Sequence, residues 1–426
     1  MSGMDRQARA SMRSGTFAFY VDQFDIYLPV LVLASIGSYF QPAGVSPTTA
    51  GVLSAMVFAS TLLGRPIGAA LFGEMADTLG RKHTTIVATT GFGVITLLIA
   101  ALPGSSTIGG WSIGLLIVLR FVNGIFLGGA YTSAVPLAME WSPPERRGLV
   151  AGRILSASPA AYATLGLLTW SLHQLMPTDN YAQLGWRIPF LIGALLAFVV
   201  VVGYRRSTTE PATQRSRRGQ PRPLAQLFTG AHRRDLLQVL VLMSGIWLAN
   251  NMVSAVLPQL LGTRLQLSPT SVSAIATANA IGLVVAFQLG GALSQRTGRR
   301  PFYLGYGAIM AIAGGSLYAL LVVTAPEAEW VVTLLMIAIG FTANASFGPI
   351  AAYLTERFPS RIRASGFGVG YSLALVLPAF YSFYLAWLSA LMPDYLAPVV
   401  LIVIAGALVS IGGALGPETK DADLHR

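Results

Sequence analysis

Residues 73–82 read Gly-Glu-Met-Ala-Asp-Thr-Leu-Gly-Arg-Lys, and residues 291–300 read Gly-Ala-Leu-Ser-Gln-Arg-Thr-Gly-Arg-Arg. Each stretch has a glycine, a polar residue, a second glycine and a basic pair at the same spacing, and each lies between two long apolar runs. A second pattern recurs at nearly the same separation along the chain: Glu140 with Arg147, and Glu356 with Arg363. Two motifs repeated together indicate that the chain consists of two related halves.

The composition requires a lipid environment. Of 426 residues, 54% are hydrophobic and only 11% are charged, whereas soluble chains carry about 25% charged residues. Unpaired backbone groups are costly in lipid, so each apolar run of roughly 20 residues is expected to be a helix. The sequence therefore predicts an all-α membrane protein with twelve transmembrane helices in two six-helix pseudo-symmetric bundles. The runs lie near 15–38, 50–72, 84–102, 112–139, 151–176, 186–204, 237–261, 271–294, 302–324, 330–354, 366–391 and 396–415.

Composition and charge exclude several function classes. The chain has no cysteine and four scattered histidines, so we expect no disulfide, no metal site and no cofactor. Its net charge of +11 resides in short segments between apolar runs, which is a topology signal and not a nucleic-acid footprint. The run near 15–38 is too long for a signal peptide and contains Asp22 and Asp25, so it is expected to be the first spanning helix.

The basic residues also predict orientation. They occupy the N-terminal tail and alternate loops: Arg6, Arg9, Arg13; Arg81, Lys82; Arg146, Arg147; Arg296, Arg299, Arg300; Arg357, Arg361, Arg363. Because positive residues mark the cytoplasmic side, both termini are expected to be cytoplasmic.

The expected domains are an N-terminal six-helix bundle at 1–204, a cytoplasmic basic linker at 205–236 and a C-terminal six-helix bundle at 237–426. A short surface helix is expected from Pro223 to Phe228. Anionic lipid would attract the linker by ~1 kcal/mol per basic residue. We favour the simpler interpretation, in which the segment is a linker between the two halves and its basic residues only reflect its cytoplasmic location.

The stretch 73–82 resembles the hallmark loop of the major facilitator superfamily, and Arg120-Phe121-Val122-Asn123-Gly124 resembles its second motif. Finer features resemble the metabolite:proton symporter family: Arg65-Pro66-Ile67-Gly68, the stretch from Glu140 to Gly148, Gly185-Trp186-Arg187-Ile188-Pro189-Phe190, the stretch from Glu356 to Arg363, and Gly370-Tyr371. The resemblance implies a protein of the bacterial cytoplasmic membrane that takes up small organic acids or zwitterions with protons. We expect it to be a monomer. Two positions depart from the family pattern: Ala130, where a glutamate is frequent, and Gln295, where an aspartate is usual.

Two acidic residues and one arginine inside the predicted helices are candidates for proton coupling. Asp22 and Asp25 are about one turn apart in the first helix, and Arg120 lies in the fourth. Removing water favours the neutral acid, whereas a nearby guanidinium favours the carboxylate. Our hypothesis is that Asp25 holds the transported proton, Asp22 assists and Arg120 is the counter-charge or substrate anchor. The alternative is an ion pair that only locks the two helices together.

Further polar residues are candidates for the substrate cavity. Arg65 is suited to a bidentate contact with a substrate carboxylate. It is equally suited to snorkelling, or to pairing with Glu74 or a group in helix 11. The other candidates are Gln23, Tyr131, Asn250, Asn251, Asn279 and Tyr371. For any one of these six, a hydrogen bond between helices is the more frequent role.

The repeated motifs are candidates for cytoplasmic gating. Bridges between their carboxylates and arginines would close the inner face. The alternative is that the arginines report topology alone. The residues concerned are Gly73, Asp77, Gly80, Arg81, Glu140, Arg147, Arg299, Glu356 and Arg363.

Proton-coupled import competes with efflux by proton antiport. Efflux transporters of this fold usually have a glycine-flanked proline motif in helix 5, and the stretch from Ser156 to Ala161 lacks those glycines, which favours import. A membrane enzyme or sensor would need a nucleophile with a base, a metal set or a soluble module, and the sequence shows none of these. We therefore expect a transporter and not an enzyme.

Overall fold

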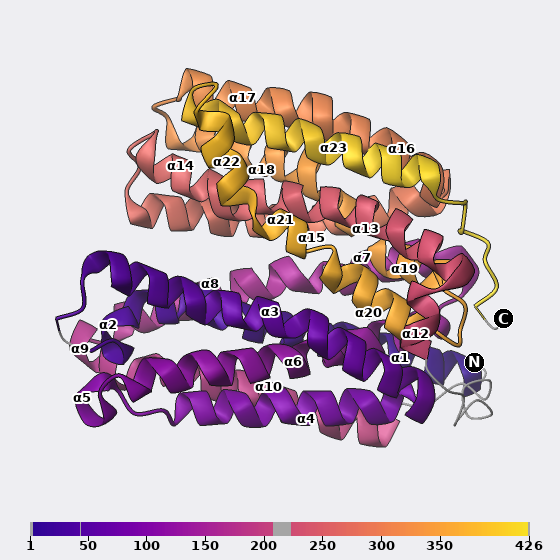
Figure 1. Ribbon diagram of the computed structural model, residues 1–426, viewed down its shortest axis with the longest axis horizontal. Helices are drawn as coiled ribbons and strands as arrows, with labels where there is room; N and C mark the ends of the chain where they lie inside the picture. The colour runs from indigo at the N-terminus through magenta and orange to yellow at the C-terminus, as the bar shows by residue number, and fades with distance from the viewer. Residues whose placement is uncertain (1–2, 43, 208–222, 425–426) are drawn as a thin grey trace. The chain divides into compact units, whose positions relative to one another are not determined.

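The computed structural model describes residues 3–42, 44–207 and 223–424. All regular secondary structure in these ranges is helical. Two compact units are present (Figure 1): Met1–Trp141 with Ala160–Leu224, and Ser142–Pro159 with Ala225–Arg426. Most of the predicted basic linker, residues 208–222, lies outside the described residues.

The first unit contains most of the first six predicted helices. Its long helices are α1 (Gly3–Leu31), α3 (Pro47–Leu79), α4 (Arg81–Ala100), α6 (Trp111–Glu140), α8 (Ala157–Leu175) and α10 (Arg187–Ser207). Its short elements are η1 (Leu33–Ile36), α2 (Gly37–Phe40), α5 (Ser105–Ile108), α9 (Thr178–Asn180) and the π-turn η3 (Tyr181–Gly185).

The second unit contains the other half of the chain and one segment of the first half. That segment is η2 (Pro144–Arg146) with α7 (Arg147–Leu155). The helices that follow are α13 (Gly230–Asn251), η4 (Met252–Val256), α14 (Leu257–Thr263), α15 (Pro269–Thr297), α16 (Arg299–Ile309), η5 (Met310–Gly314), α17 (Gly315–Thr324), α18 (Glu329–Asn344), η6 (Ala345–Phe347), α19 (Ile350–Arg357), α20 (Arg363–Leu373), α21 (Val376–Ala379), α22 (Tyr381–Ser389), η7 (Asp394–Leu396) and α23 (Ala397–Leu415). The predicted short helix is present as α12 (Pro223–Phe228).

Ten helical segments of the described ranges are long and apolar enough to cross a membrane. They coincide with ten of the twelve predicted runs. The other two runs, 15–38 and 151–176, also fold as helices. In the first, Asp22, Gln23 and Asp25 lower the hydropathy, and the second is interrupted at Ser156. The count of twelve spans stays a prediction.

The two copies of the loop motif have the same backbone geometry. Gly80 ends α3 with φ 107°, and Gly298 ends α15 with φ 96°, a region that favours glycine. Both preceding helices also begin alike, because the hydroxyls of Ser46 and Ser268 accept a main-chain N–H in the first turn and a proline follows each serine. The repeat seen in the sequence is therefore a repeat of structure.

Close packing of α3 on α6 fixes the centre of the first unit. Gly64 and Gly68 of α3 face α6, while Gly124 and Gly128 of α6 face α3, and an added Cβ atom at any of the four would fall on main-chain atoms of the other helix. For Gly128 those atoms belong to Arg65. Small residues of this kind let membrane helices approach closely, so this contact sets the main-chain position of Arg65.

The core of the first unit brackets a polar segment of α1. One cluster of buried apolar side chains includes Phe24 and Leu28, and another includes Ala18 and Val21. Asp22, Gln23 and Asp25 lie in the same stretch of α1 and are buried as well.

We predict that Gly124→Leu destabilises the protein, because the new side chain has no room between α6 and α3, and overpacking of this kind typically costs ~1–3 kcal/mol. The matched control is Gly114→Leu on the same helix, where nothing lies within 4 Å of an added Cβ atom. The measurement is the midpoint of thermal unfolding in detergent. Equal midpoints for the two variants would contradict the packing argument.

Candidate functional site

A buried ion pair joins α1 to α6. Arg120 Nη1 lies 3.4 Å from Asp25 Oδ2, and the exposed fractions of the two side chains are 0% and 1%. The same guanidinium donates to the main-chain oxygen of Asp25 at 3.4 Å and to Thr61 Oγ1 of α3 at 3.0 Å. The structure thus brings together two of the three residues predicted to couple proton movement.

The other oxygen of Asp25 is also occupied. Thr96 Oγ1 of α4 donates to Asp25 Oδ1 at 2.5 Å, and Asn123 Nδ2 donates to Thr96 Oγ1 at 3.1 Å. Sequence reasoning did not assign Thr61 or Thr96 to the site, because a threonine in an apolar run has no distinguishing spacing. Asn123 lies within the second motif, so its position is the one signal that pointed here.

Asp22 has a looser environment. Arg65 Nη2 of α3 lies 3.8 Å from Asp22 Oδ2, and Gln23 Nε2 donates to the same oxygen at 2.8 Å. Within the described ranges, Asp22 Oδ1 is buried without a hydrogen-bond partner.

Arg65 is held on a second side by an aromatic ring. Its guanidinium carbon lies 4.8 Å from the centroid of the Tyr131 ring, which belongs to α6. With 6% of its surface exposed, Arg65 does not snorkel. Contact with Asp22 is a pairing that the sequence alternatives did not include.

The buried charges inside the helices balance. Among the buried charged residues of the described ranges, Asp22, Asp25, Arg65 and Arg120 lie away from helix ends, whereas the others lie at or near a helix end. Two carboxylates and two guanidiniums have a formal sum of zero. The formal charge of the cluster is therefore zero.

The remaining cavity candidates lie in the second unit. Asn250 Oδ1 accepts a hydrogen bond from Ser254 Oγ at 3.4 Å, and Asn251 Nδ2 donates to the main-chain oxygen of Pro378 at 3.0 Å. Asn279 is buried with its side-chain oxygen unpartnered in the described part of the chain. Tyr371 accepts at its main-chain oxygen from Trp247 Nε1 at 3.0 Å. For Asn251 this is the contact between helices expected as the more frequent role.

The gating candidates of the first unit form one cluster. Arg81 forms an ion pair with Glu140 at the end of α6, and its Nη2 lies 3.7 Å from Asp77 of α3. Gly80 supplies the turn that directs Arg81, and Gly73 is buried two turns earlier. The hallmark loop therefore ties together the ends of α3, α4 and α6.

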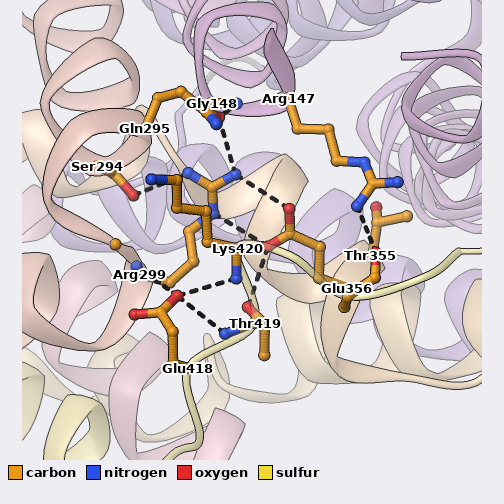
Figure 2. A network of polar contacts seen from close by, with 12 residues as sticks. Arg147, Gly148, Ser294, Gln295, Arg299, Thr355, Glu356, Glu418, Thr419 and Lys420 are labelled. Atoms are coloured by element: carbon orange, nitrogen blue, oxygen red, sulfur yellow. Dashed lines mark hydrogen bonds and ion pairs between the residues drawn. The ribbon is translucent and has the colours of Figure 1, made fainter. Parts of the chain in front are cut away.

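The second unit repeats this pair (Figure 2). Arg299 Nε and Nη2 donate to the two carboxylate oxygens of Glu356, each at 3.0 Å. Both side chains have 0% exposure. The arginine of each loop motif thus binds the glutamate of the second repeated motif, as Arg81 binds Glu140.

Gln295, where the family usually has an aspartate, holds the start of α7. Its Oε1 accepts from the main-chain N–H of Gly148 at 2.6 Å, and its Nε2 donates to the main-chain oxygen of Pro144 at 3.1 Å. A carboxylate has no donor for the second bond. The neutral amide therefore makes a contact that the usual residue would lose.

The segment after α23 completes this cluster (Figure 2). The Glu418 carboxylate accepts main-chain N–H bonds from Arg299 and Arg300, at 2.9 and 3.1 Å, at the start of α16. Thr419 Oγ1 donates to Glu356 Oε2 at 3.0 Å. Sequence reasoning assigned no role here, although an acidic residue directly after the last apolar run was an available signal.

Two further predicted gating arginines bind the same segment. Arg147 Nη1 donates to the main-chain oxygen of Ala422 at 2.6 Å, and Arg363 Nη1 donates to that of Leu424 at 2.9 Å. The arginine of each Glu/Arg pattern therefore has a partner in the C-terminal segment.

Glu418 makes this segment sensitive to acid. Burial raises the pKa of Glu418, but hydrogen bonds from four main-chain N–H groups lower it more, so the net pKa lies below the usual glutamate value. A lowered pKa means that the stabilisation is complete above the unfolded value of about 4.3 and is lost as the pH falls through the folded value.

We predict that the wild-type protein unfolds at a lower temperature as the pH falls below about 4, and that Glu418→Gln lacks this part of the dependence. The measurement is thermal unfolding in detergent at pH 7 and below pH 4. Identical pH profiles for the wild type and Glu418→Gln would rule out the proposed role of this carboxylate.

One family model and three known proteins, all described as transporters or transporter families, are similar to this chain. The family model described as "Major Facilitator Superfamily" matches residues 15–369 and 239–422. The "Proline/betaine transporter" of Salmonella typhimurium is 26% identical over 99% of this chain and 85% of its own length. The "Alpha-ketoglutarate permease" of Escherichia coli is 31% identical over 83% of this chain and 81% of its own length. The solved structure of the "proton:xylose symporter XylE" is similar in fold, with a TM-score of 0.77, 18% identity and 98% coverage of both chains.

Proposed function

Since the chain belongs to the major facilitator superfamily, we propose that it imports a small organic acid or zwitterionic metabolite together with protons by alternating access. It is a multi-pass membrane transporter and not an enzyme. The observation that supports proton coupling is the pair of buried Asp–Arg contacts in the middle of the helices.

Burying these charges is expensive. An ionised side chain near the bilayer centre costs at least ~2.5–3.5 kcal/mol on insertion scales. Replacing a buried ion pair by well-packed apolar residues is often neutral or stabilising. A pair that served only to lock α1 against α6 would therefore contribute little to stability. Exchange of a proton at one of the carboxylates is a reason for such a pair to exist.

The similar proteins support the substrate class. One is named for proline and betaine and another for α-ketoglutarate, and XylE is named as a proton symporter. These names cover zwitterions, an organic acid and proton coupling. We propose that the substrate of this chain lies within the same two chemical classes.

The complete proposal has twelve spanning helices in two bundles, 1–204 and 237–426, joined by the linker 205–236, with both termini cytoplasmic and a monomer as the working unit. Asp22, Asp25 and Arg120 handle the proton, and Arg65 is a substrate anchor. The residues proposed for the substrate cavity are Gln23, Arg65, Tyr131, Asn250, Asn251, Asn279 and Tyr371.

We predict that reconstituted protein accumulates labelled carboxylates or betaines when the outside is acidic, and that the double variant Asp22→Asn/Asp25→Asn does not. Without ionisable carboxylates, the helix cluster has no site for the proton. The measurement is uptake into liposomes under an imposed pH gradient. The matched control is Glu327→Gln, a neutralised acid in an exposed loop.

Retained accumulation in the double variant would overturn the proton-coupling proposal. Expulsion of the solute against the same gradient would instead establish efflux by antiport, the alternative function. Substrate counterflow in the double variant tests that it is folded, because counterflow needs no net proton movement.

The gating proposal yields a separate prediction. Asp77 and Glu140 both contact Arg81, so Asp77→Asn should weaken the cluster and favour an inward-open state. The wild-type chain has no cysteine, so a single Thr355→Cys, at a fully buried position, reports opening by its rate of thiol labelling. We expect faster labelling in Asp77→Asn. An unchanged rate, with the exposed Glu145→Cys as the reference position, would argue against gating by Asp77.

A further inference from the structure

We propose that Asp22 and Arg65 form an exchange pair: a proton taken up by Asp22 releases Arg65 to bind the substrate's carboxylate, so that one singly charged carboxylate anion crosses with one proton. This inference rests on the proposed function and specifies its substrate class. It also reverses the order expected from the sequence, in which Asp25 held the proton and Asp22 assisted.

The two buried ion pairs are not equivalent. Each carboxylate oxygen of Asp25 has a partner, Thr96 on one side and Arg120 on the other. A proton added to either oxygen of Asp25 would weaken a hydrogen bond or ion pair that this oxygen already makes. The Asp25–Arg120 pair is therefore the more firmly held of the two.

Asp22 has room for a proton. Its Oδ1 atom is buried and accepts no hydrogen bond within the described ranges, and its distance to Arg65 is 3.8 Å, against 3.4 Å for the other pair. A buried carboxylate oxygen without a donor loses its hydration and gains nothing in return. Protonation at Oδ1 removes the negative charge without displacing any described contact.

The surroundings of Asp22 leave Arg65 as its main counter-charge. On α1 itself, Asp25 and Gln23 are close by. α3 contributes Arg65, and α6 contributes Arg120, which is engaged by Asp25, and Tyr131, which is engaged by Arg65. α10, which also packs on α1, has no ionisable residue between Arg187 and Tyr204. Neutralising Asp22 therefore leaves the positive charge of Arg65 without its carboxylate.

Arg65 is suited to replace that carboxylate with another. Its planar fork matches a carboxylate in two parallel hydrogen bonds. The Tyr131 ring faces the guanidinium and keeps a favourable contact with the cation while its anionic partner changes. The substrate carboxylate thus takes the place that the Asp22 carboxylate vacates.

Charge balance then selects the substrate. The empty cluster of two aspartates and two arginines sums to zero, and one proton on Asp22 makes it +1. A singly charged carboxylate returns the sum to zero, whereas a dianion makes it −1 and a zwitterion leaves it at +1. An uncompensated charge in a low-dielectric interior is strongly unfavourable. The proton enters from outside water at Asp22 Oδ1, and both proton and anion leave on the inner side.

The first test uses purified protein and labelled probes of three charge classes: the monocarboxylates lactate and pyruvate, the dicarboxylates succinate and 2-oxoglutarate, and the zwitterions glycine betaine and proline. We expect binding of a monocarboxylate that weakens about tenfold per pH unit while Asp22 is ionised. In Asp22→Asn the same binding should persist and lose this pH dependence. Arg65→Gln should abolish it.

Two further variants separate this role from a structural one. Asp22→Glu restores an acid and should restore the pH dependence, so a loss in Asp22→Asn is not caused by misfolding. Glu327→Gln removes an exposed carboxylate outside the cluster and should keep the pH dependence of binding. Loss of the pH dependence in Asp25→Asn with retention in Asp22→Asn would overturn the exchange pair.

The second test measures the charge that moves. In liposomes with the membrane potential clamped by potassium and valinomycin, uptake driven by a pH gradient should be independent of the potential. Proton-driven uptake confined to zwitterions, or uptake that follows the potential, would overturn the inference and leave the proposed function intact. Absence of proton-driven uptake for all three classes would overturn the proposed function and this inference with it.

Discussion

A charge buried inside a membrane-embedded helix bundle needs an opposite charge beside it. In the first unit, this requirement determines which helices lie next to one another. Asp22, Asp25, Arg65 and Arg120 come from three helices, and their charges cancel only while those helices keep their places. The glycine contact between α3 and α6 fixes the main chain of Arg65. Close packing therefore holds in place the same side chains whose charges must cancel. A change in the charge of one of these four side chains changes which of them form ion pairs.

The two repeated halves differ in where they contain buried charges. At the ends of the helices both units have the same arginine–glutamate pair, Arg81 with Glu140 and Arg299 with Glu356, as expected of a shared scaffold. Away from the helix ends, the described part of the chain places buried charges in the first unit alone. The second unit offers neutral groups such as Asn251 and Asn279 instead. This asymmetry favours proton handling by one half and hydrogen bonding by the other.

Much of this was accessible from sequence. Hydropathy predicted the helices, the repeat located the motif clusters, and the second motif pointed to Arg120. The contacts between individual side chains could not be predicted, because they depend on the rotation of each helix about its axis and on the distances between helices. The contacts of Arg65 with Asp22 and Tyr131 are the main example. The substitution of Gln295 for an aspartate predicted only a weaker charge at this gate. Its hydrogen bond to the main-chain oxygen of Pro144 was not predictable, because Pro144 is distant in sequence. The contacts of Glu418 with the start of α16 could not be predicted for the same reason.

The number of protons taken up when an anion binds tests the Asp22–Arg65 exchange pair most directly. A monocarboxylate that binds to purified protein in unbuffered solution at neutral pH should draw protons from the medium, close to one for each anion bound, and a pH indicator dye measures this uptake. We expect this proton uptake in the wild type and none in Asp22→Asn, which still binds the anion. Anion binding by the wild type without proton uptake would contradict the exchange pair.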